Sequence, residues 1–138
     1  MTADEARATR CGLLRHRGNP RADLNYLVEL DGRAAGGAAV QLTYVPDRLV
    51  LEDTAFDAYL AALRADETLA VEALALTILD DIGNEIVPRW VRVVVAKPRA
   101  GARIHRAIAE DRQPNWDDPH ILANVRNALN PVAGGDTD

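Results

Sequence analysis

The sequence predicts an α+β fold in which a four-stranded antiparallel sheet carries two helices on one face, in the order ββααββ. Three observations lead to this prediction. Two strand-like segments with a glycine-rich turn between them come first, two helix-like segments follow, and a run rich in β-branched residues comes after Pro88. With 138 residues the chain is long enough for one domain with a two-layer core, which we place at residues 16–111.

The first two strands are expected to form a hairpin. Residues 24–30 alternate partly with a period of two, and residues 38–45 form the second strand. Asp31-Gly32 and Gly36-Gly37 supply the turn between them. Pro46 ends the second strand because proline cannot donate a hydrogen bond to a neighbouring strand.

The first helix of the middle pair is expected to begin after Glu52 and to end near Arg64. Asp53 and Thr54 are good N-cap residues, and Asp57 follows Thr54 by three residues, as in a capping box. These acidic groups also lie at the positive end of the helix dipole. A strand pattern therefore passes through Glu52 directly into an amphipathic helix.

The second helix is expected at about residues 68–86, with Asp80 and Asp81 on its wetter side, and Pro88 prevents its continuation. Residues 90–95 are the strongest strand candidate, and residues 97–101 resemble a turn. The segment 102–108 fits either a fourth strand or the start of a helix.

The two ends of the chain are expected to lie outside the domain. Residues 1–15 are predicted to be a flexible N-terminal segment. Residues 112–138 form a tail with a short helix at 120–129, which could pack on a neighbouring subunit. We find no internal repeat and no low-complexity segment.

Composition narrows the class of protein. The net charge of −5, with 15 arginines and a single lysine, gives the whole chain no basic footprint, so nucleic acid is not an expected partner. No apolar run is long enough to cross a membrane. One cysteine cannot form an internal disulfide, and the N-terminus lacks the apolar stretch of a secretory signal, so we expect a cytoplasmic protein.

The segment 52–59 resembles the signature motif of the 7-cyano-7-deazaguanine (nitrile) reductases of queuosine biosynthesis. That motif reads Glu-Ser-Lys-Ser-hydrophobic-Lys-Leu-Tyr, and Glu52, Ala55, Phe56 and Tyr59 fit it. Thr54 and Asp57 replace its two lysines. The family has the tunnelling fold, or T-fold, whose subunits join edge to edge into a barrel, so the resemblance implies a homo-oligomeric ring.

Further landmarks extend the resemblance over roughly residues 16–101. Pro88-Arg89-Trp90 matches the family's Pro-Arg-aromatic, and counting back from it places Glu72 at the helix glutamate that anchors a purine or pterin. Pro98-Arg99-Ala100-Gly101 resembles the family's Pro-Arg-Gly-Gly turn. Asp23 falls at the position of the catalytic aspartate, and His16, seven residues earlier, occupies the position of the catalytic cysteine.

These departures change the chemistry that the resemblance implies. In the family a cysteine thiolate adds to the nitrile carbon, the aspartate relays a proton and NADPH delivers hydride. Histidine cannot form that thioimide, and Asp57 sets a negative charge where cofactor phosphates would lie. We therefore predict no cofactor. NADPH enters only under an alternative in which Cys11 is the nucleophile.

Each candidate residue also has a purely structural explanation. Glu72 can be a solvated helical glutamate, and Glu52 can serve only the helix dipole. Asp23 can cap a turn, or it can be a general acid or base if desolvation raises its pKa. His16, between two arginines, can be an exposed loop residue or a general base.

Our main prediction is an enzyme that binds a 7-deazaguanine, purine or pterin-like heterocycle through Glu72 and Glu52. It would act on that base without NADPH by acid–base chemistry, with His16 and Asp23 as catalytic residues. A true NADPH-dependent reductase using Cys11 is one alternative, and a non-catalytic binding or scaffold subunit is another. We predict no metal, because His16, His105 and His120 are widely separated.

Overall fold

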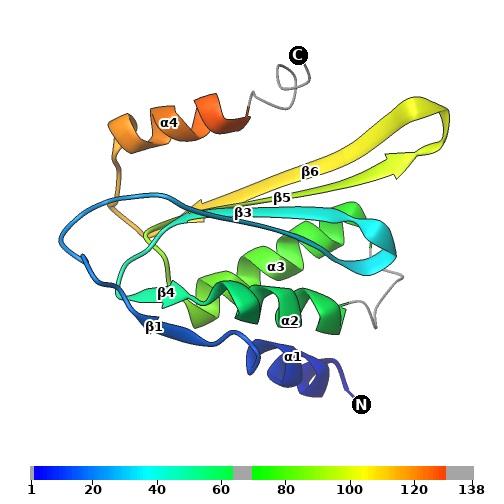
Figure 1. Ribbon diagram of the computed structural model, residues 1–138, viewed down its shortest axis with the longest axis horizontal. Helices are drawn as coiled ribbons and strands as arrows, with labels where there is room; N and C mark the ends of the chain where they lie inside the picture. The colour runs from blue at the N-terminus through cyan, green and yellow to red at the C-terminus, as the bar shows by residue number, and fades with distance from the viewer. Residues whose placement is uncertain (1, 64–69, 130–138) are drawn as a thin grey trace.

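The computed structural model describes residues 2–63 and 70–129. A four-stranded antiparallel sheet lies at its centre, with strand order β2-β3-β5-β6, and a two-stranded sheet pairs β1 with β4 (Figure 1). The helices are α1 Ala3–Cys11, α2 Asp53–Leu63, α3 Val71–Glu85 and α4 Pro119–Leu129. The strands are β1 His16–Gly18, β2 Val28–Arg33, β3 Ala39–Val45, β4 Leu49–Leu51, β5 Trp90–Arg99 and β6 Arg103–Arg112.

The helices lie in layers on both sides of the central sheet. Helices α2 and α3 cover one face, α1 lies beyond them, and α4 lies on the opposite face (Figure 1). The predicted α+β class and the helix pair on the sheet are therefore confirmed. The barrel of subunits stays a prediction.

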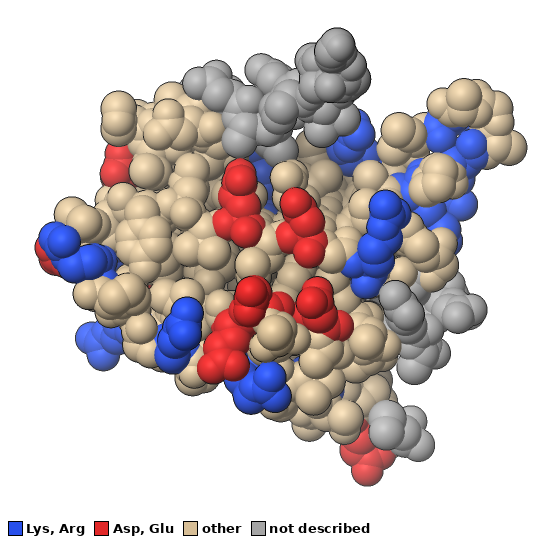
Figure 2. All heavy atoms as spheres, viewed as in Figure 1, with Lys and Arg blue, Asp and Glu red and all other residues tan. Residues whose placement is uncertain are grey.

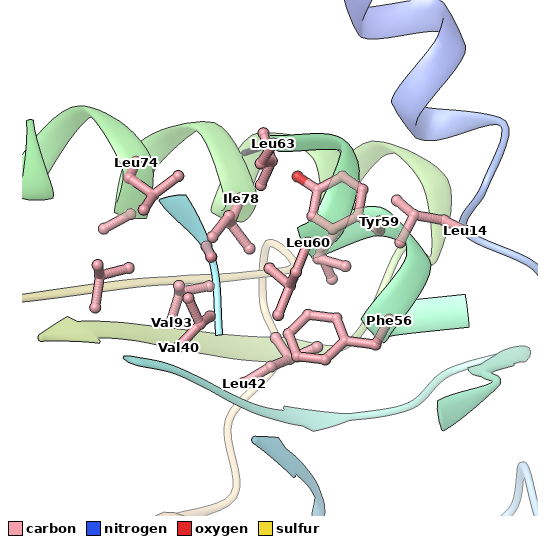
Figure 3. Close-up of a cluster of buried hydrophobic side chains, with 14 of the residues drawn as sticks. Leu14, Val40, Leu42, Phe56, Tyr59, Leu60, Leu63, Leu74, Ile78 and Val93 are labelled. Atoms are coloured by element: carbon pink, nitrogen blue, oxygen red, sulfur yellow. The ribbon is translucent and has the colours of Figure 1, made fainter. Parts of the chain in front are cut away.

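The main core fills the space between α2, α3 and the sheet. Figure 3 shows Phe56, Tyr59, Leu60 and Leu63 of α2 together with Leu74 and Ile78 of α3, packed over Val40, Leu42 and Val93 of the sheet. Alternate residues of β3 and β5 point into this core, as the period of two in a strand requires. A second, smaller cluster lies on the other face, where Val125 of α4 packs with Val45 and Trp90. The C-terminal helix thus packs on its own chain.

The first strand of the hairpin begins four residues later than we predicted, at Val28. The physical reason is Arg89, whose guanidinium donates hydrogen bonds to the carbonyl oxygens of Ala22 and Leu24, at 2.6 and 3.0 Å. It also donates to Asn25 Oδ1 at 3.1 Å. These bonds hold the segment before Val28 as a loop.

The turns also differ from the prediction. Asp31-Gly32 belongs to β2, and the chain reverses at Gly36 and Gly37, whose φ angles of 62° and 84° suit glycine. Strand β5 continues through residues 97–99, which we had placed in a turn, and reverses at 100–102. The ambiguous segment 102–108 lies almost entirely in strand β6, since it pairs with the whole length of β5.

Helix α2 begins at Asp53, so Asp53 and Thr54 are its first two residues and not the N-caps that we had predicted. Its expected end near Arg64 lies outside the described residues. The carbonyl of Glu52 accepts hydrogen bonds from the N–H groups of Ala55 and Phe56, at 3.1 and 3.2 Å. Glu52 is therefore the residue at the helix boundary, where a carboxylate favours the dipole.

The N-terminal segment, expected to be flexible, contains α1. Thr2 and Glu5 form a capping box at its start. Near its end Arg10 Nε donates to Asp81 Oδ2 at 2.7 Å. Our placement of Asp81 on the wetter side of α3 was wrong, because α1 covers it and leaves it 1% exposed.

Candidate functional site

Glu72 lies at the start of α3, where the helix dipole favours a carboxylate. Its Oε2 is 2.8 Å from Nε2 of His105 on β6. Hydrogen bonds from its own backbone N–H and from His105 lower the pKa of the Glu72 carboxyl. The side chain is 62% exposed, so an ionised acceptor faces solvent at this end of the molecule.

His105 connects Glu72 to Arg99. A guanidinium nitrogen of Arg99 lies 3.4 Å from Nδ1 of His105. Since a guanidinium can only donate, Nδ1 acts as the acceptor and Nε2 carries the proton that goes to Glu72. The three residues therefore form a short chain of directed hydrogen bonds.

An open hollow of about 580 Å³ adjoins this chain. Residues of the β5–β6 hairpin line it: Arg99, Ala100, Arg103, Ile104 and His105. The hollow combines a small apolar surface with two guanidinium groups, and the Glu72 carboxylate is hydrogen-bonded to one of its walls.

Glu52 lies at a different part of the helix layer, between β4 and α2. Its Oε1 is 3.4 Å from Nε of Arg15, and its backbone N–H donates to the Arg15 carbonyl at 3.0 Å. His16 follows Arg15 and pairs with Leu51 across the two short strands. The structure therefore brings His16 close to Glu52 in the fold, although 36 residues separate them in sequence.

Asp23 lies in the loop that Arg89 holds before β2. Its two carboxylate oxygens accept hydrogen bonds from Arg21, each at 2.9 Å, and its side chain is 64% exposed. The bond from Arg21 lowers the pKa of Asp23. Asp23 therefore lacks the pKa raised by desolvation that we expected of a general acid at this position.

The two glutamates that we predicted to bind one base lie far apart. Leu51, beside Glu52, donates its N–H to Tyr44, which pairs with Val91 at the start of β5. His105, beside Glu72, pairs with Lys97 near the end of β5. Six residues of strand separate these positions, which is about 20 Å at ~3.3 Å per residue. One chain therefore does not bring Glu52 and Glu72 together.

The residues at the family's lysine positions do not fit a dinucleotide phosphate. Thr54 and Asp57 are both exposed on α2, and Asp53 adds a second negative charge to the same turn. The thiol of Cys11 is buried at the end of α1, and burial, together with nearby Asp81, raises its pKa. A thiolate nucleophile is disfavoured in this position.

Sequence reasoning missed His105 as a partner of Glu72, since we considered it only as a metal ligand. Its position in an alternating strand was the one available signal, because alternate residues of β6 face the helices. Among residues 2–63 and 70–129 no three histidine, cysteine or acidic side chains gather as a metal site. The same part of the chain contains no helix suited to spanning a membrane.

Comparison with known proteins assigns the sequence of this chain to a family. The family model described as "QueF-like protein" matches residues 37–115, which include β3, both central helices and the β5–β6 hairpin. The apo crystal structure of an archaeosine synthase, QueF-Like, is similar with a TM-score of 0.46 and 19% identity. The match covers 64% of this chain and 91% of the synthase chain.

Several curated relatives carry the name NADPH-dependent 7-cyano-7-deazaguanine reductase. The Nitrosococcus oceani protein is 35% identical over 85 residues, which are 62% of this chain and 65% of that protein. The Nitratidesulfovibrio vulgaris protein is 35% identical over 69 residues, 49% of this chain and 41% of its own length. The Acidithiobacillus ferrooxidans protein is 28% identical over 117 residues and is covered to 82%. The first two relatives are thus matched over less than two thirds of their length.

The matched region contains Glu52, Glu72 and His105, whereas Cys11, His16 and Asp23 precede it. From the extent of that match, the chain belongs to the QueF-like protein family.

Proposed function

We propose that this protein binds a 7-deazaguanine, purine or pterin-like base, and that Glu72 is the residue that recognises it. The observation that carries the proposal is the exposed, ionised carboxylate of Glu72, oriented by His105 beside an open hollow. A guanine-like edge presents a ring N–H and an amino group side by side, and one carboxylate accepts both. Such charge-assisted hydrogen bonds contribute about 1.5–3 kcal/mol each.

Glu52 takes part, under this proposal, from a neighbouring subunit. The ~20 Å separation along β5 exceeds the span of a single base, so both glutamates reach one ligand only if two chains contribute. The outer edges of β2 and β6 carry no strand partner among the described residues. Free edges of this kind favour edge-to-edge pairing, which is how the predicted ring would form.

If the protein is a catalyst, we expect its catalytic group to be the imidazole of His16, which lies close to Glu52. His16 lies in β1, next to Arg15, which is paired with Glu52, and a histidine there is suited to acid–base chemistry that needs no NADPH. The Asp23 carboxylate would have to break its hydrogen bonds with Arg21 before it could act as a second acid–base group. Reduction through Cys11 and a purely binding role are the two competing proposals.

Calorimetry tests the binding proposal directly. We would titrate 7-cyano-7-deazaguanine, guanine and neopterin into the wild type and into Glu72→Ala. Loss of one or two charge-assisted bonds predicts at least about tenfold weaker binding of the recognised base. Glu85→Ala, at the other end of α3, is the matched control and should bind as the wild type does. Equal affinity in Glu72→Ala would contradict the proposal.

Mixing two variants that each fail to bind the base tests whether the site is shared between two subunits. Glu52→Ala and Glu72→Ala chains, dissociated and reassembled together, should regain binding in part because some sites then hold both glutamates. Reassembly of either variant alone should not. If a base is turned over, His16→Ala should abolish turnover while leaving binding intact. NADPH oxidation that Cys11→Ser abolishes would instead establish the reductase alternative.

A further inference from the structure

The tip of the β5–β6 hairpin concentrates positive charge in an acidic protein. Residues 96–106 contain Lys97, Arg99, Arg103 and Arg106 but no aspartate or glutamate, whereas the whole chain has a net charge of −5. Figure 2 shows basic side chains gathered on this projecting hairpin, while acidic side chains lie over the middle of the same face. The hairpin tip is therefore a locally basic part of the surface, although other basic side chains also lie at the left and lower parts of this view.

Two of these arginines face each other directly. Arg99 and Arg103 are partners in the antiparallel register, on the two sides of the turn at 100–102. Like charges at directly opposite positions destabilise a strand pair. Within the described residues neither guanidinium forms a salt bridge with an acidic side chain, and Arg103 Nε donates only to the Ala100 carbonyl at 3.2 Å. An anion between the two guanidiniums would remove this repulsion.

The same arginines line the hollow beside Glu72. Arg99 contacts His105, which contacts Glu72, so the proposed base-binding carboxylate and the two cations belong to one connected site. A free base is neutral, so it can accept hydrogen bonds from a guanidinium but cannot neutralise the charge of two of them. The hollow of about 580 Å³ is of the size that accommodates ligands larger than a base alone.

We propose that the ligand of this site carries a phosphate, so that the protein recognises its base as part of a nucleotide. The base edge binds Glu72, and the phosphate binds Arg99 and Arg103, whose planar guanidiniums match phosphate oxygens in paired hydrogen bonds. This inference rests on the proposed function and extends it from a free base to a phosphorylated one.

Guanine, guanosine and guanosine 5′-monophosphate serve as a graded set of probes for calorimetry. The wild type should bind the monophosphate at least about tenfold more tightly than guanosine, and this ratio should fall with rising salt. Arg103→Ala should bring the ratio close to one while leaving guanosine binding nearly unchanged. Arg99→Ala should also bring the ratio close to one, but it should weaken guanosine binding as well, because Arg99 hydrogen-bonds to His105, which orients Glu72. Arg48→Ala, an exposed arginine outside this site, should keep the wild-type ratio. Thermal melts of all variants verify that the hairpin is folded.

The results separate this inference from the function on which it rests. Weaker binding of both guanosine and the monophosphate in Glu72→Ala, with a ratio of one in the wild type, would overturn the phosphate site and leave base binding in place. Binding that is indifferent to Glu72→Ala, or absent for all three probes, would overturn both. A guanine-containing RNA oligonucleotide that binds more tightly than the monophosphate, with the same dependence on Arg99 and Arg103, would support the phosphate site and assign the phosphate to an RNA strand.

Discussion

Arg10 Nε lies 2.7 Å from Oδ2 of Asp81, and this bond joins residues 71 positions apart in the chain. The Asp81 side chain is only 2% exposed and the Arg10 side chain 18%. Tyr59 also donates its hydroxyl to the same carboxylate oxygen, at 2.5 Å. The carboxylate thus connects α1, α2 and α3 at one buried point.

Removing Arg10 should destabilise the protein. Arg10→Met leaves a buried carboxylate without its strongest partner, which costs about 3 kcal/mol, since only the more distant Arg7, at 3.7 Å, remains as a cation. Urea unfolding followed by circular dichroism measures this loss. Arg17→Met, on the exposed strand β1, should change the free energy of unfolding by less than about 0.5 kcal/mol. Similar values for the two variants would show that Asp81 does not depend on α1.

Stability should decline at alkaline pH because of Tyr59. Burial first, and then the bond to Asp81, raise the pKa of its phenol above the ordinary value of 10.0. The unfolded chain then loses a proton that the folded chain keeps. The free energy of unfolding should therefore be unaffected by Tyr59 below about pH 10 and fall above it by about 1.4 kcal/mol per pH unit.

Tyr59→Phe tests that assignment. The variant should show a shallower decline above pH 10, since one titrating group has been removed. Part of the slope should remain, because burial also raises the pKa of Tyr44. Identical slopes in the wild type and in Tyr59→Phe, measured by denaturant unfolding at several pH values, would contradict the prediction.

Cys11 should react slowly with thiol reagents in the folded protein. The thiol is buried, and its raised pKa keeps it protonated near neutral pH. We expect modification by a disulfide reagent to be at least about tenfold slower than in denaturant. Arg10→Met should accelerate it, because weaker docking of α1 exposes Cys11 more often. Reaction at the rate of the unfolded chain would show that Cys11 is accessible, as the reductase alternative requires.

Two glycine substitutions should have opposite effects. A Cβ at Gly32 of β2 would come within 2.5 Å of Leu60 Cδ1, a fully buried side chain of α2. Gly32→Ala should therefore cost about 1–3 kcal/mol through overpacking. A Cβ at Gly83 of α3 meets no atom within 4 Å. Gly83→Ala should stabilise the protein by up to about 1 kcal/mol, because alanine favours a helix interior. Thermal melts of the two variants should shift in opposite directions.

Much of the fold followed from local sequence. The strand pattern in 38–45, the helix-favouring residues after Glu52 and the proline at position 88 each act over one strand or one or two helix turns. They located β3, α2 and the end of α3. The start of β2 was misplaced, since it depends on hydrogen bonds from Arg89, more than 60 residues away.

The sequence likewise predicted only part of the candidate site. Glu72 was identified from its position relative to Pro88-Arg89-Trp90, but its partner His105 depends on the register that pairs β6 with β5. The separation between Glu52 and Glu72 likewise depends on which ends of the helices and strands lie together. Local patterns of polarity were enough to place β3, α2, α3 and β5 in their order, but they predicted neither α1 nor β1 and left the segment that forms β6 ambiguous. Tertiary packing alone decided that Asp81 is buried, that His105 meets Glu72 and that Arg99 faces Arg103, because each contact requires distant segments to be held at a fixed register.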